Sequence, residues 1–245
     1  MNDSKTTLIT GGAKRIGRTV AKHLHERNHN IMIHYRSSTQ DAQQLKHELN
    51  SLRANSCEIV QADLSDINSF ESINNHAMKT FGRLDVLINN ASSFYPTPLA
   101  QVDETKWDDL MASNLKAPLF LTKQLLPQLQ KNGGCILNII DVYAERPLAH
   151  HPIYCSAKAG LKMLTKSLAR DLAPNIRVNG IAPGAILWPE NDAMLDSQED
   201  LLKRIPLNRL GDPEDIAKTA CFLIETAPYI TGQIIAVDGG RSVMP

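Results

Sequence analysis

Residues 10–17 read Thr10-Gly11-Gly12-Ala13-Lys14-Arg15-Ile16-Gly17, directly after a short apolar run and directly before an amphipathic stretch. The run Thr6–Thr10 is rich in β-branched residues and predicts a strand, whereas Ile16, Val20 and Leu24 recur at a spacing of four and predict a helix. Glycines between a strand and a helix permit a tight turn and a close approach to phosphate, which the helix N-terminus attracts. The stretch therefore predicts a turn that binds a dinucleotide, with a purely structural turn as the alternative.

Short apolar runs alternate with amphipathic stretches along the rest of the chain. Most of the runs are continuous in hydrophobicity, which is typical of strands that a parallel sheet buries on both faces. The predicted strands are Thr6–Thr10, Asn30–Tyr35, Cys57–Ala62, Val86–Asn89, Cys135–Ile140, Ile176–Ile181 and Ile234–Val237. A helix is expected to begin near Pro213. The alternation predicts a Rossmann-type α/β fold, a doubly wound parallel sheet of about seven strands, with residues 1–245 as a single domain.

The composition excludes several classes of protein. Lys and Arg together number 26, as do Asp and Glu, so the chain lacks the basic character expected of a partner of nucleic acids. Its four cysteines lie far apart in sequence, which disfavours a disulfide framework and fits a reducing compartment. No signal region and no membrane-spanning run of about 18 apolar residues is present. We therefore expect a cytoplasmic protein without a membrane partner.

Two features are less regular. The stretch Ala185–Arg204 predicts either a lid or binding loop, or a pair of helices that the pattern reveals poorly. Four histidines cluster in sequence, three of them in or just after one surface-like helix, at His23, His25, His29 and His34. Because no set of carboxylate or cysteine ligands accompanies them, we expect no metal site.

The residues after the second predicted strand select the cofactor. In dinucleotide folds, an acidic residue about 20 positions beyond the glycine turn holds the ribose 2′-hydroxyl of NAD. Here the strand ends His34-Tyr35-Arg36-Ser37-Ser38, without an acidic residue. Arg36 can instead pair with a 2′-phosphate, to which Ser37 can donate, and Lys14 adds positive charge in the glycine turn. We therefore predict NADP(H), with a solvated Arg36 as the alternative.

Two further segments follow predicted strands at the edge where such folds bind ligands. Asp63 either accepts a hydrogen bond from the adenine amino group or caps the next helix, whose pattern starts near Ile67. The segment Asn89-Asn90-Ala91-Ser92 follows the fourth predicted strand. Its small residues would let the chain pass close to the ribose of the cofactor.

Tyr154 and Lys158 stand four residues apart, so a helix would point both the same way. An ammonium beside a phenol favours the phenolate and lowers the pKa of the tyrosine from its usual value of about 10. The tyrosine then becomes a usable acid near neutral pH. The alternative is a helical turn with an exposed lysine.

The order of these motifs resembles the short-chain dehydrogenase/reductase family. The shared segments are the glycine turn, Asn90-Ala91-Ser92, Asn114, Tyr154 with Lys158, Pro183-Gly184 and Val237-Asp238-Gly239-Gly240. The resemblance implies that Tyr154 donates a proton and that Lys158 holds the cofactor ribose and lowers the pKa of the tyrosine. It also implies that Asn114 supports a proton relay through water and that Pro183 and Gly184 lie near the nicotinamide.

Two positions depart from the usual pattern of that family. Arg15 replaces a glycine of the turn, and Asp141 replaces the usual serine 13 positions before Tyr154. Together with the stretch Ala91–Leu99, they resemble the pteridine reductases. That resemblance implies that Phe94 stacks on a pterin and sandwiches it against the nicotinamide. The substrate pocket that it implies consists of Arg15, Ser92, Phe94, Asp141, Tyr154 and Trp188.

The chemistry of C=N reduction also fits an aspartate at position 141. Such a reduction delivers hydride to carbon and a proton to nitrogen, and a carboxylate can accept from pterin N–H groups or feed the proton chain. It would also oppose ionisation of Tyr154 and keep that residue a proton donor. The alternatives are that Asp141 only caps a turn or pairs with Arg146, and that Phe94 only packs within its loop.

The sequence thus predicts an NADPH-dependent reductase of a pterin such as dihydrobiopterin or dihydromonapterin, with dihydrofolate as a further candidate. The alternatives are a short-chain reductase of a ketone or acyl carbonyl, and a non-catalytic sensor of NADP(H). Family resemblance adds the expectation of a homotetramer. The predicted catalytic residues are Asn114, Asp141, Tyr154 and Lys158. The predicted cofactor site comprises Gly11, Lys14, Arg15, Ile16, Gly17, Tyr35, Arg36, Ser37, Asp63, Leu64, Asn90, Ala91, Ser92, Lys158, Pro183 and Gly184.

Overall fold

All seven predicted strands form, and they join one parallel sheet in the order β3-β2-β1-β4-β5-β6-β7. The structure, a computed structural model, describes residues 4–187 and 198–244. The strands are β1 (Thr6–Ile9), β2 (Asn30–Tyr35), β3 (Cys57–Gln61), β4 (Val86–Asn89), β5 (Cys135–Ile139), β6 (Arg177–Pro183) and β7 (Ile234–Val237). This confirms the Rossmann-type fold and the single domain. Only β6 differs appreciably, because it extends to Pro183 rather than ending at Ile181.

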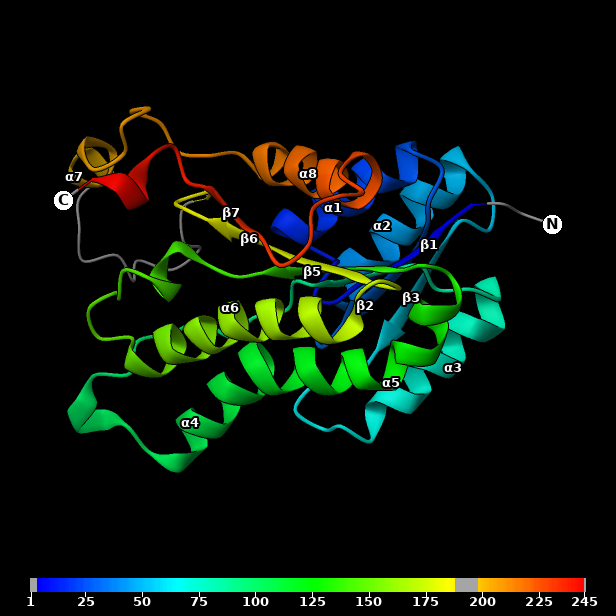
Figure 1. Cartoon of the computed structure of the whole chain (residues 1–245), viewed down its shortest axis with the longest axis horizontal. Helices are drawn as coiled ribbons and strands as arrows, with labels where there is room; N and C mark the ends of the chain where they lie inside the picture. The colour runs from blue at the N-terminus through cyan, green and yellow to red at the C-terminus, as the bar shows by residue number, and fades with distance from the viewer. Residues whose placement is uncertain (1–3, 188–197, 245) are drawn as a thin grey trace.

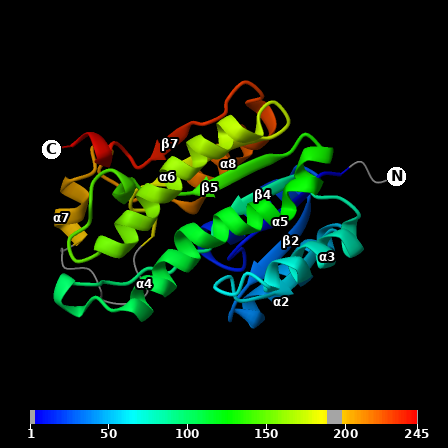
Figure 2. The same cartoon turned by 60° about the horizontal axis from the view of Figure 1, so that its bottom comes forward.

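Helices cover both faces of the sheet, with α1, α2 and α8 on one face and α3, α5 and α6 on the other (Figure 1). Their bounds are α1 (Arg15–Glu26), α2 (Thr39–Leu52), α3 (Ser69–Phe81), α4 (Glu104–Met111), α5 (Ala117–Lys131), α6 (Pro152–Leu172), α7 (Gln198–Lys203) and α8 (Pro213–Cys221). A π-helical turn, η2 (Ala112–Lys116), joins α4 to α5, so that the three segments run as one long rod (Figure 2). The remaining short turns are η1 (Leu99–Gln101), η3 (Val142–Ala144), η4 (Phe222–Thr226) and η5 (Arg241–Val243).

Two hydrophobic cores hold the layers together, one on each face of the sheet. Successive strand residues point to opposite faces, so Ile9 belongs to the core beneath α1, α2 and α8, whereas Leu8 belongs to the other core. Ile33 and Met32 divide in the same way along β2. This explains why the strands read as continuous apolar runs: both faces of each central strand are buried.

The strand order reverses direction between β1 and β4, which lie side by side at the middle of the sheet. Chain segments that leave β1 and β4 therefore diverge to opposite sides, and parallel pairing brings their carboxyl ends to the same edge. Ligands of doubly wound folds bind at this point, outside the carboxyl ends of the strands. The glycine turn after β1 and the segment after β4 both lie there.

Two sequence predictions outside the sheet have different outcomes. The predicted helix start is confirmed, since α8 begins at Pro213 and Asp212 caps it by accepting from the Glu214 backbone amide at 2.9 Å. Within Ala185–Arg204, α7 is present, and Trp188, predicted as a pocket residue, lies outside the described residues. In the described part of the chain, no helix is both long and apolar enough to cross a membrane.

The expectation of a surface-like helix for the histidine cluster is wrong for His25 and His29, which are both buried. The His25 Nε2 atom lies 2.7 Å from Ser56 Oγ, and His29 Nδ1 lies 2.7 Å from Thr7 Oγ1. These contacts satisfy polar groups inside the domain, which the spacing of residues along one helix does not reveal. Among the described residues, no group of three or more His, Cys, Asp or Glu could hold a metal ion.

His29 should make stability depend on pH below neutrality. Burial, the largest cause, lowers the pKa of His29 from 6.5 to about 4, although its Nε2 atom lies 3.3 Å from Glu225 Oε1. Between these two values the unfolded chain binds a proton that the folded chain does not, so the free energy of unfolding falls as pH falls. One histidine contributes a slope of about 1.4 kcal/mol per pH unit in this window.

We expect His29→Gln to lower the free energy of unfolding at pH 8, because it disturbs the contact with Thr7. Between pH 6.5 and pH 4.5 the free energy of unfolding of this variant should fall less steeply than that of the wild type. The difference in slope should correspond to about one proton taken up on unfolding. Urea denaturation at a series of pH values measures both quantities. Identical slopes for the variant and the wild type would show that His29 is not the group concerned.

Candidate active site

The glycine turn after β1 has a backbone that demands glycine at two positions. Gly11 has a φ of +58°, in the left-handed region. A Cβ atom on Gly17 would lie 2.8 Å from the carbonyl oxygen of Gly11 and 2.7 Å from Asn90 Nδ2. Arg15 also has a positive φ, +50°, although it carries a long side chain. Such a conformation costs about 1–3 kcal/mol at a non-glycine residue and is found mainly at functional sites.

The segment after β4 holds this turn in place. Thr10 Oγ1 accepts from the backbone amides of Asn90 at 2.9 Å and Ala91 at 3.0 Å. In return, Asn90 Nδ2 donates to the carbonyl oxygens of Thr10 at 2.9 Å and Gly11 at 3.0 Å. The two predicted cofactor segments are therefore brought together, and Asn90 shapes the turn rather than projecting from it.

The residues predicted to select the cofactor lie at the carboxyl ends of β2 and β3. Arg36 is exposed, and its Nη1 atom is 3.9 Å from Asp109 Oδ1, a long contact that leaves the guanidinium accessible. Asp63 accepts from the backbone amide of Ser65 at 2.9 Å and from its hydroxyl at 2.8 Å, and these bonds lower the pKa of Asp63. Because α3 begins only at Ser69, Asp63 is not the cap of that helix.

Tyr154, which is buried, and Asp141, which is partly buried, form a pair just beyond the end of β5. The hydroxyl of Tyr154, on α6, donates to Asp141 Oδ2 at 2.7 Å. The other oxygen of Asp141 accepts from the Tyr143 backbone amide at 2.9 Å and so caps η3. Asp141 thus acts as a cap and also contacts the tyrosine. Burial raises the pKa of Asp141, and these hydrogen bonds partly oppose that effect.

The predicted lowering of the Tyr154 pKa by Lys158 is wrong in this structure. Burial and then Asp141 raise the pKa of Tyr154 well above its usual value. Lys158 is buried, its Nζ atom donates to the carbonyl oxygen of Ile139 at 3.0 Å, and it lies 5.6 Å from the centre of the tyrosine ring. Burial also lowers the pKa of Lys158, to about 8. The phenol is therefore held protonated, because a carboxylate is closer to its hydroxyl than an ammonium.

Asn114 lies in the π-helical turn η2, which widens the rod formed by α4 and α5. Its Oδ1 atom accepts from Ser92 Oγ at 2.7 Å, and its Nδ2 atom donates to the carbonyl oxygens of Ser93 and Leu110 at 2.9 Å. Single π-helical turns inside longer helices often mark functional sites. Here the turn joins the side chain of Asn114 to the segment after β4, and Ser92 also contacts the hydroxyl of Tyr154.

Phe94 lies over the tyrosine, on the segment after β4. Its ring is stacked on His151 with centroids 4.8 Å apart and planes 11° apart, and it meets Tyr154 edge-on, also at 4.8 Å. The ring is nonetheless 49% exposed, so Phe94 is not fully covered by its own loop. His151 was not predicted from the sequence, because its contact with Phe94 depends on α6 starting at Pro152, next to it.

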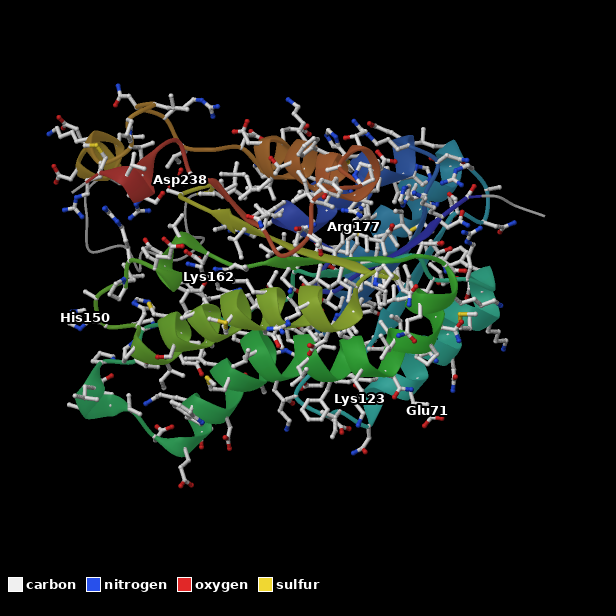
Figure 3. The ribbon with its side chains drawn as sticks, in the orientation of Figure 1. Glu71, Lys123, His150, Lys162, Arg177 and Asp238 are labelled. Atoms are coloured by element: carbon white, nitrogen blue, oxygen red, sulfur yellow. The ribbon has the colours of Figure 1, made fainter. Side chains whose placement is uncertain are left out.

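Two other residues of this region were not predicted from the sequence. Arg241, in η5, lies over the ring of Tyr143 at 5.3 Å from its centre, and its charge lowers the pKa of Asp141. The turn that carries Arg241 is held by Asp238, at the end of β7 (Figure 3), whose carboxylate accepts from the amides of Gly240 and Ser242. Arg241 and Asp141 lie 100 positions apart in the chain, which hides their proximity in the sequence.

Pro183 and Gly184 lie at the end of β6, on the same edge as Asp141 and the glycine turn. The Gly184 amide donates to the carbonyl oxygen of Val237 at 3.0 Å. A Cβ atom at this position would lie 2.7 Å from Asp238 Cα, so only glycine fits between the two chain segments. The predicted residues from β1, β4, β5, β6 and α6 are thus gathered at one edge of the sheet.

Comparison with known proteins gives the same overall assignment. Residues 11–242 match a family model described as enoyl-(acyl carrier protein) reductase. The chain is 37% identical to 3-oxoacyl-[acyl-carrier-protein] reductase FabG of Staphylococcus aureus over 244 residues, which cover 98% of this chain and 99% of that protein. It is also 37% identical to pteridine reductase 1 of Leishmania tarentolae over 277 aligned positions, 96% of each chain.

These similarities extend over nearly the whole chain and agree with the sheet order, the glycine turn and the Tyr154–Lys158 spacing. FabG and pteridine reductase 1 reach the same identity, so the comparisons show the family but not the substrate. The chain belongs to the short-chain dehydrogenase/reductase family and is an oxidoreductase of that family.

Proposed function

We propose that this enzyme uses NADPH to reduce a dihydropterin to its tetrahydro form. The observation that carries the proposal is the contact of Asp141 with the Tyr154 hydroxyl, at 2.7 Å, beneath the half-exposed ring of Phe94. A flat, aromatic substrate rich in N–H groups suits a site that offers a stacking surface and a carboxylate together. The 37% identity to pteridine reductase 1 is consistent with the proposal.

The proton chemistry of the site fits reduction of a C=N bond. NADPH, when bound, supplies the hydride that the ring carbon accepts, and the ring nitrogen then needs one proton. Tyr154 is held protonated by burial and by Asp141, so its hydroxyl carries the proton that the ring nitrogen needs. Asp141, whose pKa burial raises, can accept a hydrogen bond from a substrate N–H, and after the reaction Tyr154 regains from solvent the proton that it gives up.

Arg36 and the glycine turn support NADPH rather than NADH. The end of β2 presents Arg36 where an acidic residue would hold a ribose 2′-hydroxyl, and its guanidinium is exposed, with Nη1 3.9 Å from Asp109 Oδ1. The side chain of Lys14 lies nearby on the turn and pairs with Asp41 at 3.1 Å, both residues being partly exposed. Their positive charges are available to phosphate groups.

A 3-oxoacyl thioester reductase is the second candidate, because the FabG proteins match this chain as well as pteridine reductase 1 does. Carbonyl reduction by this family uses the same tyrosine but a serine at the position of Asp141. A screen of NADPH oxidation with dihydrobiopterin, dihydromonapterin, dihydrofolate and acetoacetyl-CoA separates the two candidates. Turnover of the thioester alone would refute the pterin proposal, and turnover of neither would favour a non-catalytic sensor of NADP(H).

We expect Asp141→Ser to lower kcat with dihydrobiopterin by roughly 10²–10⁴-fold, the usual contribution of general acid catalysis. Tyr154→Phe should lose a similar factor, because it removes the donor itself. Asp141→Asn matches the aspartate in shape and tests whether the negative charge is needed. NADPH affinity, measured by fluorescence titration, should stay near the wild-type value in all three. Undiminished kcat in Asp141→Ser would contradict the proposed role of the carboxylate.

Phe94→Ala should raise KM for the pterin while kcat is largely retained, because stacking acts in both the ground state and the transition state. A lost aromatic pair corresponds to a rise of about 2–10-fold. Phe222 is a matched control, since it is 45% exposed but lies in η4. Steady-state kinetics of Phe94→Ala and Phe222→Ala make the comparison. Equal KM values in the two variants would show that Phe94 does not stack on the substrate.

Arg36→Asp should weaken NADPH binding by roughly 10–100-fold, the range expected for one charge-assisted contact with phosphate. The same variant should improve the relative use of NADH, because the new carboxylate can accept from a ribose hydroxyl. Arg36→Lys keeps the charge but loses the planar fork, so it should lie between the two. Dissociation constants for both nucleotides measure the effect, and equal use of NADPH and NADH by the wild type would contradict it.

A further inference from the structure

His34 occupies an unusual place for a histidine, in the middle of the parallel sheet. It belongs to β2, which pairs with β1 on one side and with β3 on the other, where His34 lies opposite Val60. Its side chain is only 2% exposed. Neighbouring positions of β2 hold apolar residues that form the two cores, such as Met32 and Ile33. A polar ring at this position therefore needs partners of its own.

The ring has two partners, one from each of the two chain segments that flank β2. The backbone amide of Gly11 donates to His34 Nδ1 at 3.3 Å, and His34 Nε2 lies 3.1 Å from the carbonyl oxygen of Ala62. A backbone amide can only donate and a carbonyl oxygen can only accept, so Nδ1 is the acceptor and Nε2 carries the hydrogen. The two contacts thus require a neutral imidazole in a single tautomer.

These contacts join two parts of the dinucleotide site that are distant in sequence. Gly11 opens the phosphate turn, and Ala62 precedes Asp63 at the end of β3. The main chain of His34 adds a second bond to the turn, since its carbonyl oxygen accepts from the Gly12 amide at 3.0 Å. The amides of Gly11 and Gly12 therefore both donate to His34. The amides of the first turn of α1 instead point along the helix axis, in the direction where a helix N-terminus binds phosphate.

We propose that His34 is a positioning residue for the cofactor, whose neutral ring holds the Gly11 amide and thereby keeps the phosphate turn in its binding conformation. The proposal rests on the dinucleotide half of the proposed function and does not depend on the substrate. A glycine turn loses much conformational entropy when it becomes ordered, so a contact that orders it in advance raises affinity for the cofactor.

The environment of the ring supports a neutral imidazole. Burial lowers the pKa of His34 to about 4, and the contact with Ala62 and the charge of Asp63 oppose that effect only in part. A protonated ring would present an N–H at Nδ1 to the N–H of Gly11, so the contact with the turn would be lost. Asn90 holds the same turn from the side of β4, through the carbonyl oxygen of Gly11. The turn is thus held at its amide by β2 and at its carbonyl by β4.

Three variants separate the two functions of the ring. His34→Asn places an amide oxygen near the position of Nδ1 and keeps the acceptor for Gly11, whereas His34→Gln places its amide near Nε2 and keeps only the donor to Ala62. His34→Leu keeps neither. We expect dissociation constants for NADPH, measured without substrate, to rise about 3–10-fold for His34→Gln and His34→Leu, the effect of one hydrogen bond. His34→Asn should stay near the wild-type value.

His25→Leu is the matched control, because His25 is also buried and also makes a side-chain hydrogen bond, to Ser56 Oγ. It lies on α1 and has no contact with the phosphate turn in the described contacts of its ring. Melting temperatures should fall for both His25→Leu and His34→Leu, whereas NADPH affinity should fall only for the second.

Nitrogen-15 NMR of the wild-type protein tests the contact without any substitution. The His34 ring should show the tautomer with hydrogen on Nε2 and an accepting Nδ1, and hydrogen on Nδ1 would overturn the proposal. Equal NADPH affinity of His34→Asn and His34→Gln would overturn it as well, even if His34→Leu fails to fold. A wild-type protein that binds no NADPH would instead refute the proposed function, so the two failures are distinguishable.

Discussion

The hydrogen bonds between Thr10 and Asn90 are the contacts on which the site depends. They join the carboxyl ends of β1 and β4, the two strands at which the order of the sheet reverses. A doubly wound sheet opens a crevice at this reversal because the following chain segments leave in opposite directions. Without these bonds nothing would hold the glycine turn at a defined position relative to the segment that carries Ser92 and Phe94. The cofactor and substrate halves of the site could then not be aligned.

The chemistry of the site results from competition between burial and charge around one phenol. Lys158 and Asp141 act on Tyr154 in opposite directions, and distance decides between them: the carboxylate accepts directly from the hydroxyl, whereas the ammonium is bound to the carbonyl oxygen of Ile139. Burial is the largest cause of the raised pKa of Tyr154, and the carboxylate adds to it. The result is a tyrosine that keeps its proton rather than existing as phenolate, while the lysine donates to the carbonyl oxygen of Ile139.

The strands were predictable from the sequence because burial on both faces leaves an unambiguous apolar run, and all seven were found within a few residues. The glycine turn was also predictable, since it lies directly between one strand and one helix. The pairing of Asp141 with Tyr154 was expected from the family resemblance, because the two residues lie on different elements. The role of Asp63, which does not cap α3, and the direction of the Tyr154 pKa shift could not be predicted. Both depend on which of the possible partners is closer in space. His34, His151 and Arg241 were missed for a related reason: their partners come from distant parts of the chain.

The percentage of identical residues cannot distinguish the two candidate substrates. Reductases of C=O and C=N bonds share most of the structural requirements that constrain the sequence of this fold. Both need the same sheet, the same dinucleotide turn and the same tyrosine, which explains equal identity to FabG and to pteridine reductase 1. They differ in what surrounds the reacting bond: an oxygen needs one hydrogen bond, whereas a pterin needs a stacking surface and acceptors for its N–H groups. Phe94 and Asp141 supply these two features side by side, and two residues in 245 leave overall identity almost unchanged. The local geometry, rather than the global match, therefore carries the argument for a pterin.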